Sequence, residues 1–240
     1  MHKDDRHTQW TCNIFTIFPE IFPGPLGVSN IGKALEQDVW RLRTHNLLHF
    51  ANKHGRIDDT IYGGGCGMLL RPDVFQRAFD AMSPSDQALP FYYPSPRGEF
   101  LTQRDIEQIS KGPGLNILCG RYEGIDQRII DHYHLREFSI GDFVLLGGEV
   151  AALALTEAAV RLLPGIVAKN ESIIHDSFQN GLLEHNLYTR PFNFLGQTPP
   201  EWLLSGNHQE IERLRLEESQ RITRERRPQM WQRYQKHHEK

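Results

Sequence analysis

Residues 115–126 read LNILCGRYEGID. The five mostly apolar residues Leu115–Cys119, bounded by glycine, predict a buried strand. Gly120 and Gly124 then bracket three bulky side chains, two of them charged, which is unusual for a plain turn. A loop at the end of a core strand is where an α/β sheet usually holds its ligand. The stretch therefore predicts an α/β fold with a binding loop directly after this strand.

Outward from this stretch, apolar runs alternate with segments of helical character. Strands are predicted at Trp10–Phe18, Trp40–His49, Leu89–Tyr93, Leu115–Cys119 and Phe143–Leu146. Helices are predicted at Asn30–Glu36, Pro72–Met82, Gln103–Lys111, Ile125–Tyr133 and Glu149–Leu163. Thr102, with Asp105 three positions later, predicts an N-cap for the third of these helices. Strands alternating with helices indicate a mostly parallel sheet covered on both faces.

The pattern changes after Pro164-Gly165, which indicates a second domain. We expect an α/β domain over residues 1–167, a flexible linker over 168–178 and a smaller helical C-terminal domain over 179–240. In that last part, Asn207 is a predicted N-cap with Glu210 at the capping-box position, and a highly charged helix should run to about Pro228.

Composition limits the class of protein. In 240 residues, 39% are hydrophobic and 24% charged, which excludes an intrinsically disordered chain. No apolar stretch is long enough to cross a bilayer and the polar N-terminus has no signal-peptide core, so no membrane association is expected. Three cysteines without a C-x-x-C pair are typical of a reducing compartment, and a cytoplasmic location is expected.

Charge is unevenly distributed along the chain. The net charge is −3, but residues 205–240 carry nine Lys or Arg against six Asp or Glu, a local balance of +3. A basic tail on an acidic body indicates a polyanionic partner such as nucleic acid. A solvated helix of mixed charge explains the same pattern equally well.

Three glycine-containing segments follow one another at predicted strand ends. They are YPSPRG (93–98), LCGRYEGID (118–126) and SIGDFVLLGGE (139–149). The carboxyl ends of parallel strands share one edge, so these segments can converge on one crevice, where glycine lets the main chain approach a ligand. A dinucleotide-binding fold is excluded, because GGGCG (63–67) follows no buried strand and lacks the final glycine of that fingerprint.

These segments, together with further blocks, resemble those of the bacterial tRNA (guanine-N1)-methyltransferases, the TrmD family of the SPOUT superfamily. The further blocks are YGGGCGM (62–68), DSF (176–178), YTRP (188–191) and LLSGNH (203–208). The likeness runs from about Trp10 to Pro228. Some positions depart from the family pattern: Cys66 and Ala151 replace proline, Leu146 replaces serine or threonine, and Phe143 replaces tyrosine.

The resemblance implies a trefoil-knotted α/β domain, which chain-threading rules alone would exclude. It also implies S-adenosyl-L-methionine (AdoMet) as methyl donor, held by the three glycine segments. The residues that match its contacts are Tyr93, Ser95, Pro96, Gly120, Tyr122, Glu123, Gly124, Ser139, Ile140, Gly141, Phe143, Leu145, Gly147 and Gly148.

The implied reaction is methylation of N1 of guanosine 37, just 3′ of the anticodon in tRNA. The resemblance assigns Asp176 as the base that takes the N1 proton and Arg161 as the cation that stabilises charge on O6. Two structural alternatives stand beside these roles. Asp176 can cap a helix starting near Phe178. Arg161 can form a surface ion pair with Glu157, worth roughly 0.2–0.5 kcal/mol.

The family likeness further implies a homodimer with its active site at the subunit interface, and a linker that becomes ordered when tRNA binds. Candidate tRNA contacts are Asn207, His208, Arg213, Arg215, Arg221, Arg224, Arg226 and Arg227. No residue set has zinc-like spacing, so His132 and His134 are interpreted as surface histidines; a Mg²⁺ site leaves too little trace in a sequence to be read. Two other functions stay open: a knotted methyltransferase acting on a ribose 2′-hydroxyl or a ribosomal base, and a non-catalytic RNA-binding protein.

Overall fold

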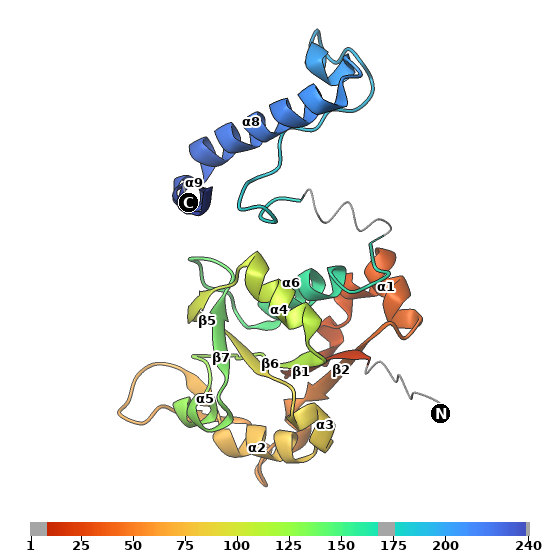
Figure 1. Ribbon diagram of the computed structural model, residues 1–240. Helices are drawn as coiled ribbons and strands as arrows, with labels where there is room; N and C mark the ends of the chain where they lie inside the picture. The colour runs from red at the N-terminus through yellow and green to blue at the C-terminus, as the bar shows by residue number, and fades with distance from the viewer. Residues whose placement is uncertain (1–8, 168–175, 239–240) are drawn as a thin grey trace. The chain divides into compact units, whose positions relative to one another are not determined.

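The computed structural model describes residues 9–167 and 176–238, so most of the predicted linker lies outside the described residues. The chain divides into two compact units, one up to residue 168 and one from residue 169. The first unit contains the sheet and the second contains the C-terminal helices (Figure 1).

A five-stranded sheet forms the centre of the first unit. Its strands are β1 (Trp10–Thr16), β2 (Trp40–Asn46), β5 (Phe91–Phe100), β6 (Gly114–Leu118) and β7 (Arg136–Ser139). They lie in the order β2-β1-β6-β5-β7, and every neighbouring pair is parallel. The strands therefore present their carboxyl ends at one edge, which confirms the predicted parallel α/β architecture.

Helices cover both faces of this sheet (Figure 1). On one face, α1 (Ser29–Glu36), α4 (Gln103–Lys111) and α6 (Glu149–Arg161) contribute to a buried apolar cluster. On the other, α2 (Pro72–Asp80) and α5 (Gln127–Tyr133) contribute to a second cluster, near the short α3 (Pro84–Gln87). The N-cap predicted at Thr102 is present at the start of α4, where Thr102 and Asp105 form a capping box.

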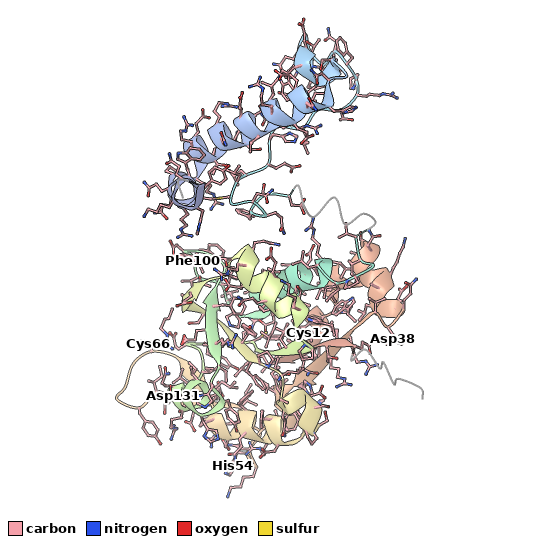
Figure 2. The ribbon with its side chains drawn as sticks, in the orientation of Figure 1. Cys12, Asp38, His54, Cys66, Phe100 and Asp131 are labelled. Carbon is pink, nitrogen blue, oxygen red and sulfur yellow. The ribbon has the colours of Figure 1, made fainter. Side chains whose placement is uncertain are left out.

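The shorter elements complete the first unit. Its 3₁₀ turns are η1 (Pro19–Ile21), η2 (Gly24–Gly27) and η3 (Leu47–Phe50). A small antiparallel hairpin joins β3 (Asp58–Thr60) to β4 (Met68–Leu70), and its loop carries the exposed Cys66, whereas Cys12 lies in the interior (Figure 2).

The prediction of a strand at Phe143–Leu146 is wrong. These residues form an irregular loop, and the last strand of the sheet is β7, earlier in the chain. The run looked like a buried strand because it is apolar, yet Val144 is 83% and Leu146 90% exposed. The polar Arg136 and Glu137 at the start of β7 conceal the strand from a search for apolar runs.

Several element boundaries also differ from prediction. Strand β2 stops at Asn46, whose side chain accepts a hydrogen bond from Leu48 N at 2.9 Å and caps a 3₁₀ turn instead. Helix α5 begins at Gln127 because Asp126 caps it by accepting from Arg128 N at 2.9 Å. Strand β5 continues through the PSPRG segment to Phe100, with an irregularity between Pro94 and Glu99.

The second unit is helical. It contains η4 (Glu201–Leu204), α8 (His208–Arg226) and α9 (Pro228–His238). Asn207 caps α8 by accepting a hydrogen bond from Glu210 N at 3.3 Å, which confirms the predicted helix start. Ile211 and Ile222 bury one side of α8, and Thr223 Oγ1 accepts a hydrogen bond from Leu183 N at 2.8 Å.

Asp86 joins several elements beneath the sheet. It accepts hydrogen bonds from Arg43 at 2.6 Å, Ser83 at 2.7 Å and Asn13 at 3.4 Å, and its carbonyl accepts from Asn116 at 2.8 Å. Burial alone would raise the pKa of Asp86, but the hydrogen bonds and the Arg43 charge outweigh it and lower the pKa. The ionised carboxylate therefore stabilises the folded state.

Asp86→Ala should lower the free energy of unfolding by about 2–3 kcal/mol at neutral pH, the range for hydrogen bonds to a charged group. Because the folded pKa is depressed, this contribution is present above the ordinary carboxyl pKa and is lost as pH falls through the folded value. Urea denaturation at several pH values measures both effects. Glu36→Ala, at an exposed carboxylate, is the control. An equal effect of both substitutions would contradict the assignment.

Candidate functional site

A cleft of about 270 Å³ lies at the carboxyl edge of the sheet, where segments from β5, the loop after β6 and the loop after β7 meet. Its lining comprises Tyr93, Pro94, Ser95, Pro96, Gly120, Tyr122, Glu123, Gly124, Phe138, Ser139, Ile140, Gly141, Phe143, Val144, Leu145, Leu146, Gly147, Gly148 and Ala151. Every residue assigned above to the methyl donor is in this set, so the structure brings the three glycine segments together.

Five lining residues were not assigned from the sequence. Pro94, Val144 and Leu146 lie inside the quoted motifs and differ from their assigned neighbours only in side-chain type. Ala151 is in the first turn of α6, three residues after Gly148, and this closeness in sequence could have identified it as a lining residue. Phe138 belongs to β7, the strand hidden from the apolar pattern, so no sequence signal identified it.

The glycines let the loops approach one another closely. A Cβ atom on Gly120 would lie 2.9 Å from the Tyr93 ring, and one on Gly124, with φ of +113°, would lie 2.9 Å from the Tyr93 hydroxyl. Gly148 N donates a hydrogen bond to Gly120 O at 3.1 Å, which joins the second and third segments. Burial raises the pKa of Tyr93, with Glu137 adding to the effect, so its hydroxyl stays protonated at neutral pH.

The cleft combines apolar walls with few charges. Ile140, Phe143 and Leu145 supply apolar surface, and Glu123 supplies a carboxylate. Ser139 bonds its own loop, because its hydroxyl donates to Gly141 O at 3.0 Å and lies 3.2 Å from Gly141 N. Such a lining suits a ligand with a flat apolar part and a cationic part.

Arg121, the charged residue in the middle of the opening motif, is absent from the cleft lining. Its Nη2 lies 2.9 Å from Glu149 Oε2, outside hydrogen-bonding alignment, and its Nε donates to Glu149 Oε1 at 3.2 Å. Thr16 Oγ1 donates to the same oxygen at 2.7 Å, and the guanidinium lies 4.4 Å from the centre of the Phe18 ring. Arg121 therefore holds neighbouring elements together.

The two predicted catalytic residues belong to different units. Arg161 is the last residue of α6 in the first unit, and Asp176 is a half-buried residue of the second. The alternative that Asp176 caps a helix is wrong, since residues 177–180 form turns and Phe178 has a φ of 80°. The catalytic roles of both residues stay predictions.

The predicted tRNA contacts lie on α8 and at its two ends. The Asn207 side chain caps this helix, and His208 is its exposed first residue. Arg213, Arg215 and Arg221 each form ion pairs with glutamates three or four residues away. Exposed pairs of this kind are worth little, roughly 0.2–0.5 kcal/mol, so a phosphate can compete for these arginines.

Two further expectations concern membranes and metals. In the described part of the chain, no helix is both long and apolar enough to span a bilayer. Among the same residues, no cluster of three or more His, Cys, Asp or Glu side chains is arranged to hold a metal ion. His132 packs edge-on against Tyr133, and both His132 and His134 are exposed.

Comparison with known proteins identifies the family. The model of the family described as "tRNA (Guanine-1)-methyltransferase TrmD" matches residues 11–233. Proteins named tRNA (guanine-N(1)-)-methyltransferase are similar: one from Ruegeria pomeroyi is 47% identical over 231 residues, covering 95% of both chains. One from Rhodospirillum rubrum is 49% identical over 92% of both chains, and one from Brucella ovis is 48% identical over 95% of this chain and 94% of its own. The chain therefore belongs to the tRNA (guanine-N1)-methyltransferase family, a family of tRNA-modifying enzymes.

Proposed function

We propose that this enzyme transfers a methyl group from AdoMet to N1 of guanosine 37 in tRNA. The observation that supports this most directly is the meeting of three glycine segments in one cleft, in a chain of this family. The decisive test is transfer of labelled methyl to tRNA transcripts carrying G or A at position 37, followed by nucleoside analysis. Label in N1-methylguanosine from the G37 transcript alone is expected. Label on a ribose would support the related 2′-O-methyltransferases, and no label would support a non-catalytic RNA-binding protein.

The cleft fits AdoMet in its chemistry. Ile140, Phe143 and Leu145 offer apolar surface for adenine, and the main chain at Gly120 and Gly141 can reach its polar edge. The Glu123 carboxylate complements the positive charge of the ligand. When bound, AdoMet supplies a methyl carbon activated by its sulfonium.

Two residues carry the proposed proton and charge chemistry. Guanine N1 bears a proton and becomes nucleophilic when it loses it, and Asp176 is the proposed acceptor of that proton. A free carboxylate, whose conjugate acid has a pKa of roughly 3.9, is a weak base for this proton. Arg161 is the proposed partner that makes the transfer feasible, because its fixed charge stabilises the negative charge developing on guanine O6.

The proposed active assembly is a homodimer. The loop after β7 and the first turn of α6 expose a run of apolar side chains. The accessible fractions are 55% for Phe143, 83% for Val144, 90% for Leu146 and 57% for Val150. A contiguous apolar patch of this kind marks an interaction surface. Because this patch borders the cleft, a second copy seated on it would place the interface at the active site, where Asp176 of the partner subunit can serve the cleft.

Mixing two inactive variants tests this arrangement. Arg161→Ala and Asp176→Ala chains, mixed in equal amounts and allowed to exchange, should regain activity at about a quarter of the sites, because half of the dimers then contain one intact site. Methylation of tRNA before and after exchange measures the recovery, and native mass spectrometry confirms that mixed dimers form. Mixed dimers without activity would show that both residues serve one cleft from the same chain.

The second unit is the proposed tRNA-binding part. The exposed arginines of α8 can exchange their glutamate partners for phosphates. Arg213→Gln together with Arg221→Gln should flatten the slope of log affinity against log salt by about 1–2. Fluorescence titration with tRNA at several salt concentrations measures this slope. The control is Lys33→Gln with Lys111→Gln, two exposed residues of the first unit. An unchanged slope would leave the arginines with their intrahelical partners.

Two broader features complete the proposal. We propose that the first unit is threaded as a trefoil knot, which membership of this family supports. We also propose a cytoplasmic location, which the free cysteines Cys12, Cys66 and Cys119 support.

A further inference from the structure

Glu149 is a charged residue with almost no solvent contact. It is the first residue of α6, directly after Gly147 and Gly148 of the cleft, and it is 1% exposed. Among the described residues, its polar partners are Arg121 from the loop after β6 and Thr16 from the end of β1. Glu149 thus joins three elements directly behind the cleft.

Arg121 passes against the backbone of the third cleft segment. A Cβ atom on Gly147 would lie 2.3 Å from Arg121 Nε and 2.6 Å from Glu149 Oε2, so only glycine leaves room for the pair. The main-chain bond from Gly148 N to Gly120 O lies between the same two segments. The ion pair and this bond together set the separation of the loops that hold the ligand.

Stability alone is a poor explanation for such a pair. Glu149 is fully buried, and the Arg121 side chain is 21% exposed. Removing such charges from water is costly, and well-packed apolar residues in their place often give equal or higher stability. The guanidinium of Arg121 is held by a hydrogen bond to Glu149 Oε1, by the carboxylate charge and by the face of Phe18, so it has little freedom to shift. What the pair supplies beyond apolar packing is a defined position for the two loops.

We propose that Arg121 and Glu149 are positioning residues for methyl transfer: their ion pair fixes the spacing of the 120–124 and 141–148 loops and so the placement of the methyl donor. This inference rests on the proposed function, because it assumes that the cleft holds AdoMet. Neither residue touches the donor; they act through Gly120, Gly147 and Gly148.

The test compares Glu149→Gln, Arg121→Met and the double variant. Each single variant should lower AdoMet affinity about tenfold and the single-turnover rate at saturating AdoMet by roughly 10–100-fold, since small misplacements of reacting groups are costly. The single variants should also lose thermal stability, because Arg121→Met leaves the buried Glu149 charge unpaired and Glu149→Gln leaves the half-buried Arg121 charge without its partner. The double variant removes both charges and should recover stability, yet keep the low affinity and rate. Arg121→Lys should retain more of the AdoMet affinity and of the single-turnover rate than Arg121→Met does.

Calorimetric titration with AdoMet, stopped single-turnover assays and thermal melts provide the three readouts. The matched control is Arg43→Met, which breaks the Arg43–Asp86 pair of 2.6 Å at β2 and should change stability alone. A double variant with wild-type affinity and rate would overturn the inference, whatever the single variants do. Failure of the wild-type enzyme to bind AdoMet would instead refute the proposed function, so the two failures are distinguishable.

Discussion

Asp176→Ala should lower the single-turnover rate of methyl transfer by roughly 10²–10⁴-fold, the usual contribution of a general base. The AdoMet affinity should stay unchanged, because the cleft is built from residues of the first unit and Asp176 belongs to the second. Asp176→Asn should lose as much, since an amide of the same shape accepts no proton. Rapid quench with labelled AdoMet and saturating enzyme measures the chemical step.

The pH dependence of this variant distinguishes a base from a structural residue. Solvent removes the guanine N1 proton increasingly as pH rises, so the deficit of Asp176→Ala should narrow at high pH. A purely structural loss would stay constant. Glu184→Ala, a half-buried carboxylate of the same unit, is the matched control and should retain the wild-type rate. Wild-type turnover in Asp176→Ala would remove this residue from the mechanism.

Arg161→Ala should lower the same rate by about 10²–10³-fold, the loss expected when a fixed group that stabilises a developing oxyanion is removed. Arg161→Lys should recover part of the rate, because lysine restores the charge but lacks the planar fork of arginine. Binding of AdoMet should again be unaffected.

The control for Arg161 is Arg104→Ala, an exposed arginine of α4 in the same unit. The measurement is the single-turnover rate at saturating AdoMet and tRNA, with tRNA affinity determined separately. A loss confined to tRNA affinity, with the chemical step intact, would assign Arg161 to phosphate binding and leave guanine O6 without its proposed partner.

Much of the fold followed from the sequence because its signals are local. The apolar Leu115–Cys119 run coincides with most of β6. Asn207 and Thr102 predicted the starts of α8 and α4, because their side chains cap helices. Strand β7 escaped notice because Arg136 and Glu137 interrupt the apolar pattern. The β3–β4 hairpin is too short to show a period, with three residues in each strand.

The candidate site was likewise predicted only in part from the sequence. Glycines at strand ends indicated a crevice, but the identity of the methyl donor and the roles of Asp176 and Arg161 came from family resemblance. The partner of Arg121 could not be predicted, since Glu149 lies 28 residues further along the chain and meets it only through the fold. Pairings of this kind depend on tertiary packing, which no local pattern encodes.

The loop of the β3–β4 hairpin offers a site for a fluorescent label close to the cleft. Cys66 is exposed there, whereas burial raises the pKa of Cys12 to about 12 and that of Cys119 well above its ordinary value. A maleimide dye should thus react with Cys66 alone, without prior substitution of Cys12 and Cys119. A Cβ atom on the neighbouring Gly67 would lie 2.4 Å from Glu123 Cγ, and Glu123 lines the cleft, so the fluorescence of that dye should change when the methyl donor binds.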